Sequence, residues 1–154
     1  MPETVNRKIL VTGAGGFVGH ALCNHLVARC DVGVIALVRR YTARLDPLVR
    51  QFVMDLDSQT VPPELLSGVS TVVHLAAIAH QPNRNESPEQ ANVRMSSHLL
   101  DSIKEASVEH LVYMSSIAVL GAGGGSPDSP LDELATPAPK TAYGRSKLPC
   151  EELI

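Results

Sequence analysis

Short apolar segments alternate with longer segments of helical periodicity along this 154-residue chain. The first apolar run, Lys8–Thr12, ends in glycines, and apolar residues at helical spacing follow it. Four further apolar runs predict strands: Val32–Val38, Gln51–Met54, Thr71–Leu75 and His110–Met114. A second helix is predicted over Ser87–Ala106, where apolar positions fall mainly on one face. The alternation predicts an α/β fold, a doubly wound parallel sheet in three α/β/α layers.

The last part of the chain has a different pattern. Gly121–Pro139 concentrates glycine and proline, so we expect one exposed loop there. A last helix is predicted to begin at Thr141, a suitable N-cap. Because Pro149 removes a helix hydrogen bond, we expect a kink or an early disruption of this helix near Arg145. No helix-stop signal precedes the end of the sequence, so we interpret residues 1–154 as one domain that is incomplete at its C-terminus.

Composition narrows the classes of function. Hydrophobic residues make up 44% of the chain, enough for one domain with a continuous core. The net charge is -3 and no long basic block occurs, so no nucleic-acid partner is expected. The cysteines Cys23, Cys30 and Cys150 lack CxxC spacing, which argues against a disulfide framework and favours a reducing cytoplasm. Neither a signal peptide nor an apolar run of about 20 residues is present, so we expect a cytoplasmic protein without a membrane partner.

Three glycines, Gly13, Gly16 and Gly19, form a G-x-x-G-x-x-G motif between the first strand and the first helix. The turn needs a residue that tolerates positive φ, the second glycine leaves room for a pyrophosphate, and the third allows close helix packing. Backbone N–H groups and the positive end of the helix would then bind the diphosphate of a dinucleotide. No Gly-Lys-Ser/Thr follows, so a Walker phosphate loop is excluded. We therefore interpret residues 1–154 as a Rossmann-like dinucleotide-binding domain.

The second strand ends in Arg39 and Arg40. A NAD site usually has an acidic residue here that binds the ribose 2′-hydroxyl, whereas guanidinium groups favour the 2′-phosphate of NADP. NADP(H) is therefore the preferred cofactor and NAD(H) the alternative; the competing interpretation of the two arginines is a solvated basic loop without a ligand. Asp55, after the third strand, either accepts a hydrogen bond from the adenine amino group or is an ordinary turn residue.

Tyr143 and Lys147 lie four residues apart in the last predicted helix, on one face. The pKa of a free tyrosine is about 10. A nearby ammonium together with an oxidised nicotinamide ring is expected to lower that pKa and to make Tyr143 a workable acid/base. Ser116 follows the fifth strand at the carboxyl edge of the sheet, where open α/β folds bind ligands, and its hydroxyl is predicted to hold the reacting substrate oxygen.

Four histidines and a cysteine have simpler explanations than ligand binding. His20, Cys23 and His25 share the first predicted helix, but His25 points elsewhere and no fourth ligand is identifiable. Helix packing is therefore favoured, and no metal site is expected. His74 is interpreted as a hydrogen-bonded core histidine and His80 as a solvated loop residue.

Six motifs, in this order, resemble the extended short-chain dehydrogenase/reductase family, also described as NAD-dependent epimerase/dehydratases. The resemblance covers essentially the whole chain. Its parts are Thr12-Gly13-Ala14-Gly15-Gly16-Phe17-Val18-Gly19, Asp55-Leu56, His74-Leu75-Ala76-Ala77, Asn92-Val93, Ser115-Ser116 and Tyr143-Gly144-Arg145-Ser146-Lys147.

The resemblance implies roles for the matched residues. Cofactor contacts are implied for Gly13, Gly16, Phe17, Val18, Gly19, Asp55, Leu56, Leu75, Ala76, Ala77 and Asn92. Tyr143 would be the acid/base, Lys147 would bind the nicotinamide ribose and tune that tyrosine, and Ser116 would orient the substrate. The implied reaction moves a hydride between NAD(P) and a nucleoside-diphosphate sugar, as in nucleotide-sugar epimerases and 4-reductases.

Departures from the family pattern narrow the activity. Ile117-Ala118-Val119-Leu120 stands where the sugar dehydratases have Thr-Asp-Glu, which disfavours dehydration and is more similar to 4-reductases and less typical epimerases. The alternatives are a steroid- or flavonoid-type ketone reductase of the same family and a non-catalytic NAD(P)-binding sensor. A substrate domain is expected beyond Ile154, so residues 1–154 alone are expected to be inactive, and a homodimer of the full-length protein is kept as a hypothesis.

Overall fold

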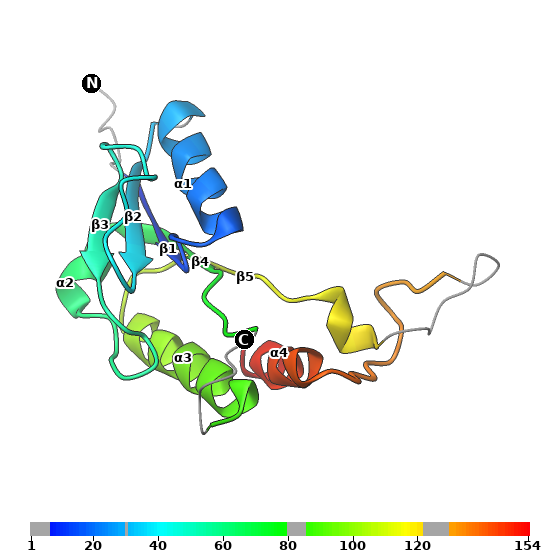
Figure 1. Cartoon of the computed structure of the whole chain (residues 1–154). Coiled ribbons are helices and arrows are strands. Elements are labelled where there is room, and N and C mark those ends of the chain that lie inside the picture. Colours follow the sequence, from blue (N-terminus) through cyan, green and yellow to red (C-terminus); the bar gives the residue numbers. More distant parts are fainter. Residues whose placement is uncertain (1–6, 30, 80–85, 122–129) are drawn as a thin grey trace. The chain divides into compact units, whose positions relative to one another are not determined.

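The computed structural model describes residues 7–29, 31–79, 86–121 and 130–154. Five strands form one parallel sheet in the order β3-β2-β1-β4-β5 (Figure 1). The strands are β1 (Lys8–Thr12), β2 (Gly33–Val38), β3 (Arg50–Val53), β4 (Val69–His74) and β5 (His110–Tyr113). The helices are α1 (Phe17–Arg29), α2 (Pro63–Leu66), α3 (Pro88–Ile103) and α4 (Ala142–Leu153), and a 3-10 helix, η1, covers Ile117–Leu120. The five predicted strands and three predicted helices are confirmed.

Both faces of the internal strand β2 are buried, which explains why that strand is apolar along its whole length. Side chains alternate between the two faces of a strand, and Val34, Ala36 and Val38 of β2 lie on the face covered by α1. Ile35 and Leu37, between them, are each only 4% exposed. Strand β2 is therefore covered on both sides, as the predicted three-layer architecture requires inside the sheet.

The chain divides into two compact units. The first contains Met1–Ala76 and His98–Met114, and thus the whole sheet with α1 and α2. The second contains Ala77–Ser97 and Ser115–Ile154, and thus most of α3 together with η1 and α4. The assignment of the whole chain to a single dinucleotide-binding domain stays a prediction.

Helix α4 begins as predicted but ends later. The Thr141 hydroxyl accepts a hydrogen bond from a first-turn N–H at 3.0 Å and caps the helix. Pro149 lies inside α4, which continues past it, so the expected early disruption near Arg145 is wrong. The helix packs against η1, and the thiol of Cys150 donates to the carbonyl oxygen of Ser146 at 3.2 Å. These contacts offset the main-chain hydrogen bond that the proline removes.

The sequence pattern did not predict α2 or η1, because each is only four residues long and shows no helical period. The predicted loop Gly121–Pro139 is confirmed for residues 130–139, which contain no helix or strand and are mostly exposed. Near its end the N–H of Ala138 donates to the carbonyl oxygen of Val119 at 2.9 Å. The loop therefore returns to η1, from which it starts.

Candidate functional site

The turn from β1 into α1 accepts only glycine at two positions. Gly13 has a φ of +67°, and a Cβ on it would lie 2.7 Å from the backbone nitrogen of Ala76. A Cβ on Gly19 would overlap the carbonyl oxygen of Gly13 and lie 2.6 Å from the Cα of Ala14. The predicted tight turn and the close packing of the helix against it are therefore confirmed.

The surface at the N-terminus of α1 is open. Gly15 and Gly16 are exposed, and a Cβ on Gly15 would have as its nearest neighbour Cγ1 of Val38, 3.9 Å away. The first N–H groups of an α-helix have no acceptor within the helix, so this end presents donors and the positive end of the helix dipole. An uncovered backbone cradle of this kind fits the diphosphate of a dinucleotide.

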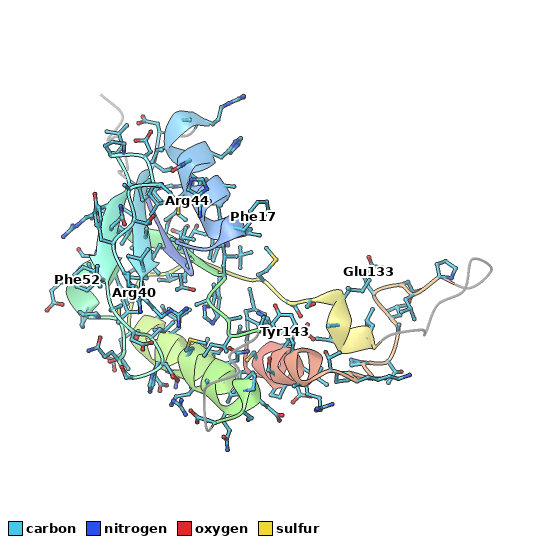
Figure 2. The ribbon with its side chains drawn as sticks, viewed as in Figure 1. Phe17, Arg40, Arg44, Phe52, Glu133 and Tyr143 are labelled. Atoms are coloured by element: carbon cyan, nitrogen blue, oxygen red, sulfur yellow. The ribbon has the colours of Figure 1, made fainter. Side chains whose placement is uncertain are left out.

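Two apolar side chains stand beside this cradle. Phe17, at the start of α1 in Figure 2, is 87% exposed, and Val18 is 48% exposed. Single exposed apolar side chains are ordinary in proteins, so exposure by itself assigns neither residue a ligand. Their contact with the diphosphate stays a prediction.

The end of β2 lies next to the glycine turn. Val38, which contacts the position of a Cβ on Gly15, is the last residue of the strand, and Arg39 and Arg40 follow it directly. Both arginines are exposed, and Figure 2 labels Arg40. The guanidinium groups are thus accessible for charge-assisted hydrogen bonds to a phosphate near the cradle.

The Asp55-Leu56 pair after β3 has structural contacts of its own. Asp55 is exposed, and its Oδ1 accepts a hydrogen bond from the N–H of Asp57 at 3.1 Å. Leu56 is only 5% exposed, and its carbonyl oxygen accepts from Nδ1 of His98 at 2.8 Å. The Leu56 side chain therefore belongs to the core, while a contact of either residue with adenine stays a prediction.

The loop after β4 is joined to the end of β1 by hydrogen bonds. Thr12 Oγ1 lies 2.7 Å from Nδ1 of His74 and accepts from the N–H of Ala76 at 3.1 Å. His74 is 1% exposed, so the predicted hydrogen-bonded core histidine is confirmed. Leu75 and Ala76 are half-buried. The bonds of Thr12 fix the backbone at which the resemblance implies cofactor contacts.

The second unit brings Tyr143 and Lys147 together on α4. Nζ of Lys147 lies 5.7 Å from the centroid of the Tyr143 ring, and Figure 2 shows that tyrosine on the helix. Lys147 is 1% exposed, whereas Tyr143 is half-buried. A lysine is rarely this buried unless its ammonium has a specific role or partner. The predicted pair on one helical face is confirmed.

The acid–base properties of the pair differ from the expectation. Burial raises the pKa of Tyr143, the direction opposite to the lowering expected from a neighbouring ammonium and an oxidised nicotinamide. Burial also lowers the pKa of Lys147, while Cys150 and Glu151 act to raise it. In the chain itself, desolvation of the phenol is the largest effect on Tyr143. The charge of the nicotinamide ring is the remaining factor that could reverse this direction.

Ser116 occupies the segment that packs against α4. Its Oγ accepts a hydrogen bond from the N–H of Ala118 at 3.2 Å and caps η1. Helix α4 packs against η1 so closely that a Cβ on Gly144 would overlap the carbonyl oxygen of Ala118. Ser116 therefore lies on the element adjoining the helix that carries Tyr143, and its hydroxyl proton is still available for donation.

Asn92 has a place in a buried hydrogen-bond network. Its side chain accepts from the N–H of Ile78 at 2.7 Å and donates to the carbonyl oxygen of Ile78 at 3.1 Å and to Oγ of Ser146 at 2.8 Å. Both amide hydrogens are thus used within the protein. Ala77, just before Ile78, is half-buried. The implied cofactor contacts of Asn92 and Ala77 stay predictions.

The sequence reasoning assigned no role to Ser146, although it belongs to the quoted Tyr143-to-Lys147 motif. Its Oγ donates to the carbonyl oxygen of Tyr143 at 2.7 Å and is completely buried. The position of Ser146, three residues after Tyr143 and next to Lys147, is the sequence feature that could have marked it as part of the site. A hydroxyl on the buried side of a helix needs partners, and here those partners orient the site.

Two of the three residues with possible metal-ligand spacing, Cys23 and His20, have structural contacts of their own. Cys23 is completely buried in the core, and Nε2 of His20 donates to the carbonyl oxygen of Arg44 at 2.8 Å. Within residues 7–29, 31–79, 86–121 and 130–154, no three His, Cys, Asp or Glu side chains are grouped as metal ligands would be. His80 lies outside the described residues.

None of the described helices has the length and apolar character needed to cross a bilayer. The doubly wound parallel sheet, with a glycine turn between its first strand and first helix, defines a Rossmann-like nucleotide-binding protein. The sequence profile of the NAD dependent epimerase/dehydratase family matches residues 9–154, and the chain belongs to that family.

Comparison with individual proteins agrees with this assignment. The chain is 30% identical over 156 residues to a D-erythronate dehydrogenase of Haemophilus influenzae, covering 96% of this chain and 49% of that protein. It is 31% identical over 155 residues to a UDP-glucose 4-epimerase of Vibrio cholerae, covering 96% and 46%. The crystal structure of UDP-glucuronic acid 4-epimerase from Bacillus cereus in complex with NAD matches with a TM-score of 0.80 at 26% identity, covering 95% and 50%. The chain thus spans about half the length of these relatives.

Proposed function

We propose that the protein is an enzyme that moves a hydride between NAD(P) and a nucleoside-diphosphate sugar, with Tyr143 as the acid/base. The observation that carries this proposal is the buried ammonium of Lys147, 5.7 Å from the centroid of the Tyr143 ring. A charge kept beside a phenol favours the phenolate and so supports proton transfer.

Residues of the first unit bind the cofactor in this proposal. The backbone of Gly13–Gly19 binds the diphosphate, Asp55 and Leu56 contact the adenine, and Leu75 and Ala76 lie along the cofactor. When bound, the cofactor supplies hydride donation and acceptance. The open cradle at the N-terminus of α1 supports this assignment, because it offers backbone donors and the positive end of the helix to a phosphate.

Residues of the second unit carry out the proton transfer. Tyr143 takes the proton of the sugar hydroxyl when that carbon is oxidised and returns it when the resulting ketone is reduced. Ser116 donates its hydroxyl proton to the same oxygen and orients it. Lys147 favours the phenolate electrostatically and binds the nicotinamide ribose. Asn92 and Ala77 complete the set of cofactor contacts.

We further propose NADP(H) as the preferred cofactor and NAD(H) as the alternative. Two exposed guanidinium groups follow β2, next to the glycine turn, where NAD-specific sites usually have a carboxylate. The B. cereus relative, by contrast, was crystallised with NAD. The chain spans about half the length of its relatives. For the whole protein we also propose a separate substrate domain, a homodimer and a cytoplasmic location.

A steroid- or flavonoid-type ketone reductase of the same family is the second candidate. The similarity to D-erythronate dehydrogenase, whose name does not refer to a nucleotide sugar, favours a substrate of another class. Fold alone does not choose between these substrates. A third hypothesis, a cofactor-binding sensor without catalysis, is disfavoured by the buried lysine beside Tyr143.

The test is turnover by the full-length polypeptide with UDP-sugars and with small ketones. Tyr143→Phe is expected to lower kcat by about 100-fold or more and to leave dinucleotide affinity nearly unchanged. Tyr41→Phe is the matched control, because Tyr41 is 73% exposed and lies outside the proposed proton-transfer set. Undiminished turnover in Tyr143→Phe would exclude the assigned role. Turnover of ketones but not of UDP-sugars would select the second candidate.

A further inference from the structure

Ser115 and Glu151 are joined by a hydrogen bond that the proposed reaction does not use. Ser115 precedes Ser116 at the end of β5, and its hydroxyl donates to Oε1 of Glu151 on α4. Both side chains are half-buried. A carboxylate that accepts a hydrogen bond from a fixed hydroxyl is held in one orientation.

The Ser115–Glu151 bond is the second of two attachments between this segment and α4. The first is the close contact between Ala118 and Gly144. On α4 the two attachments are at Gly144 and Glu151, and Lys147 lies between them. On the facing segment they are at Ser115 and Ala118, and Ser116 lies between them. The carboxylate thus helps to fix the segment that carries Ser116 against the helix that carries Lys147.

Glu151 is also placed to act on the charge of Lys147. It follows Lys147 by four residues in an uninterrupted helix, so both side chains lie on one face of α4. Lys147 is 1% exposed, and desolvation, the largest effect on it, lowers its pKa. Glu151 and Cys150 act in the opposite direction. Of these two groups, the carboxylate is the one that is ordinarily charged at neutral pH.

Among the residues that the structure describes, η1 brings no charged side chain to α4. The residues of η1 are Ile117, Ala118, Val119 and Leu120, none of which titrates. The side-chain hydrogen bonds to α4 from α3 and from the segment before η1 come from the amide of Asn92 and the hydroxyl of Ser115. On α4 itself, Tyr143 and Cys150 are the remaining titratable groups near the lysine.

We infer that Glu151 is a positioning residue that keeps the buried ammonium of Lys147 charged and, through Ser115, fixes the Ser116 segment against α4. The part of this inference that concerns catalysis rests on the proposed function. Glu151 acts through Lys147 and Ser115 and needs no contact with substrate. Removing the charge of Glu151 should therefore change the pH dependence of the reaction without removing any contact between the protein and the substrate.

The decisive comparison uses Glu151→Gln with Glu152→Gln as its matched control. Glutamine keeps the shape and an oxygen that accepts from Ser115 but removes the charge, and Glu152 is the neighbouring exposed residue. The titration of Lys147 is followed by NMR of its Cε and Hε signals, assigned with Lys147→Met. The pKa of Lys147 is expected to fall by about one unit in Glu151→Gln and to stay unchanged in Glu152→Gln. Cys150 is present in both variants, so the difference isolates the carboxylate of Glu151.

A kinetic measurement connects this charge to the reaction. In Glu151→Gln the alkaline limb of the kcat profile, where the ammonium loses its proton, is expected to move down by about one pH unit with little change in KM. An unchanged lysine titration in Glu151→Gln overturns the inference. If the pKa of Lys147 shifts in Glu151→Gln but the unaltered protein turns over no substrate, the electrostatic role of Glu151 is supported and the proposed function is rejected.

A second variant covers the case in which Glu151→Gln does not fold. Ser115→Ala keeps the carboxylate but removes the hydroxyl that orients it, so the pKa of Lys147 is expected to fall in the same direction by a smaller amount. Circular dichroism confirms that the variant is folded. A Lys147 titration identical to that of the original protein in Ser115→Ala would overturn the positioning part of the inference.

Discussion

Nδ2 of Asn92 donates to Oγ of Ser146 at 2.8 Å, and this bond joins α3 to the helix that carries Tyr143. The hydroxyl of Ser146 in turn donates to the carbonyl oxygen of Tyr143 at 2.7 Å, so the hydrogen bonds connect Asn92 to the backbone of Tyr143. Asn92 is at the same time bonded twice to the backbone of Ile78. One buried network thus fixes the loop after β4, the middle of α3 and the first turns of α4.

Ser146→Ala is expected to destabilise the protein through this network. The substitution leaves a buried N–H of Asn92 without its acceptor, which costs about 1–3 kcal/mol. Urea unfolding followed by circular dichroism measures the loss. Ser107→Ala, at an exposed serine outside any helix or strand, is the control and should change the free energy of unfolding by less than about 0.5 kcal/mol. Equal stability of the two variants would show that the network contributes little.

Gly13→Ala is expected to cost more than a substitution elsewhere in the same turn. At a φ of +67° a Cβ is strained by about 1–2 kcal/mol, and here it would also lie 2.7 Å from the backbone nitrogen of Ala76. We expect a loss of about 3 kcal/mol or more in the free energy of unfolding. Gly15→Ala is the matched control, since its Cβ would have no neighbour nearer than 3.9 Å. If Gly13→Ala were as stable as Gly15→Ala, the close approach of the β1–α1 turn to the loop after β4 would be contradicted.

Strands and long helices could be predicted from the sequence because their signals are local. The run Val34–Val38 is apolar at every position, which requires burial on both faces, and the structure buries both. The glycine turn was identifiable for the same reason, since the φ of +67° at Gly13 and the contact of Gly19 with the carbonyl oxygen of Gly13 both arise within the turn. Thr141 was recognised as a cap from its position alone.

Features that depend on distant residues could not be predicted. The persistence of α4 through Pro149 depends on packing against η1, an element with no sequence signal. The pKa of Tyr143 was expected to fall because of the neighbouring ammonium together with an oxidised nicotinamide ring, whereas the burial of the phenol, which raises this pKa in the chain itself, had no sequence signal. Thr12 was quoted as part of a motif, but its hydrogen bond to His74 joins residues from two strands. Tertiary contacts decide each of these cases.

The arginines after β2 are expected to select the cofactor. If Arg39 and Arg40 bind a 2′-phosphate, Arg39→Ala and Arg40→Ala should each raise the Kd for NADPH by about tenfold or more, because charge-assisted hydrogen bonds contribute about 1.5–3 kcal/mol. The Kd for NADH should change little. Arg29→Ala, at the exposed end of α1, is the control. Isothermal titration calorimetry of the full-length polypeptide gives all of these values, and tighter binding of NADH by the unaltered protein would remove the NADP(H) preference.

Cys23 is expected to make the stability of the protein depend on alkaline pH. Cys23 lies on the buried side of α1 with its side chain 0% exposed, and burial raises the pKa of its thiol from 9.0 to about 11. Between these two values the native state keeps a proton that the unfolded chain loses. The free energy of unfolding therefore falls as the pH rises through this window, by about 2.7 kcal/mol for a shift of two units.

The contribution of Cys23 is isolated by comparing two pH profiles of stability. Cys23→Ala lowers stability at neutral pH, because it leaves a small cavity, but it removes the titrating thiol. Urea unfolding under reducing conditions, from about pH 8 to about pH 11, should therefore show a shallower decline in the variant than in the original protein. The shifted pKa values of Tyr143 and Lys147 are common to both proteins, so their effects on stability cancel in the difference. Parallel profiles would mean that the thiol of Cys23 ionises equally in the native and unfolded states, which its burial in an apolar core argues against.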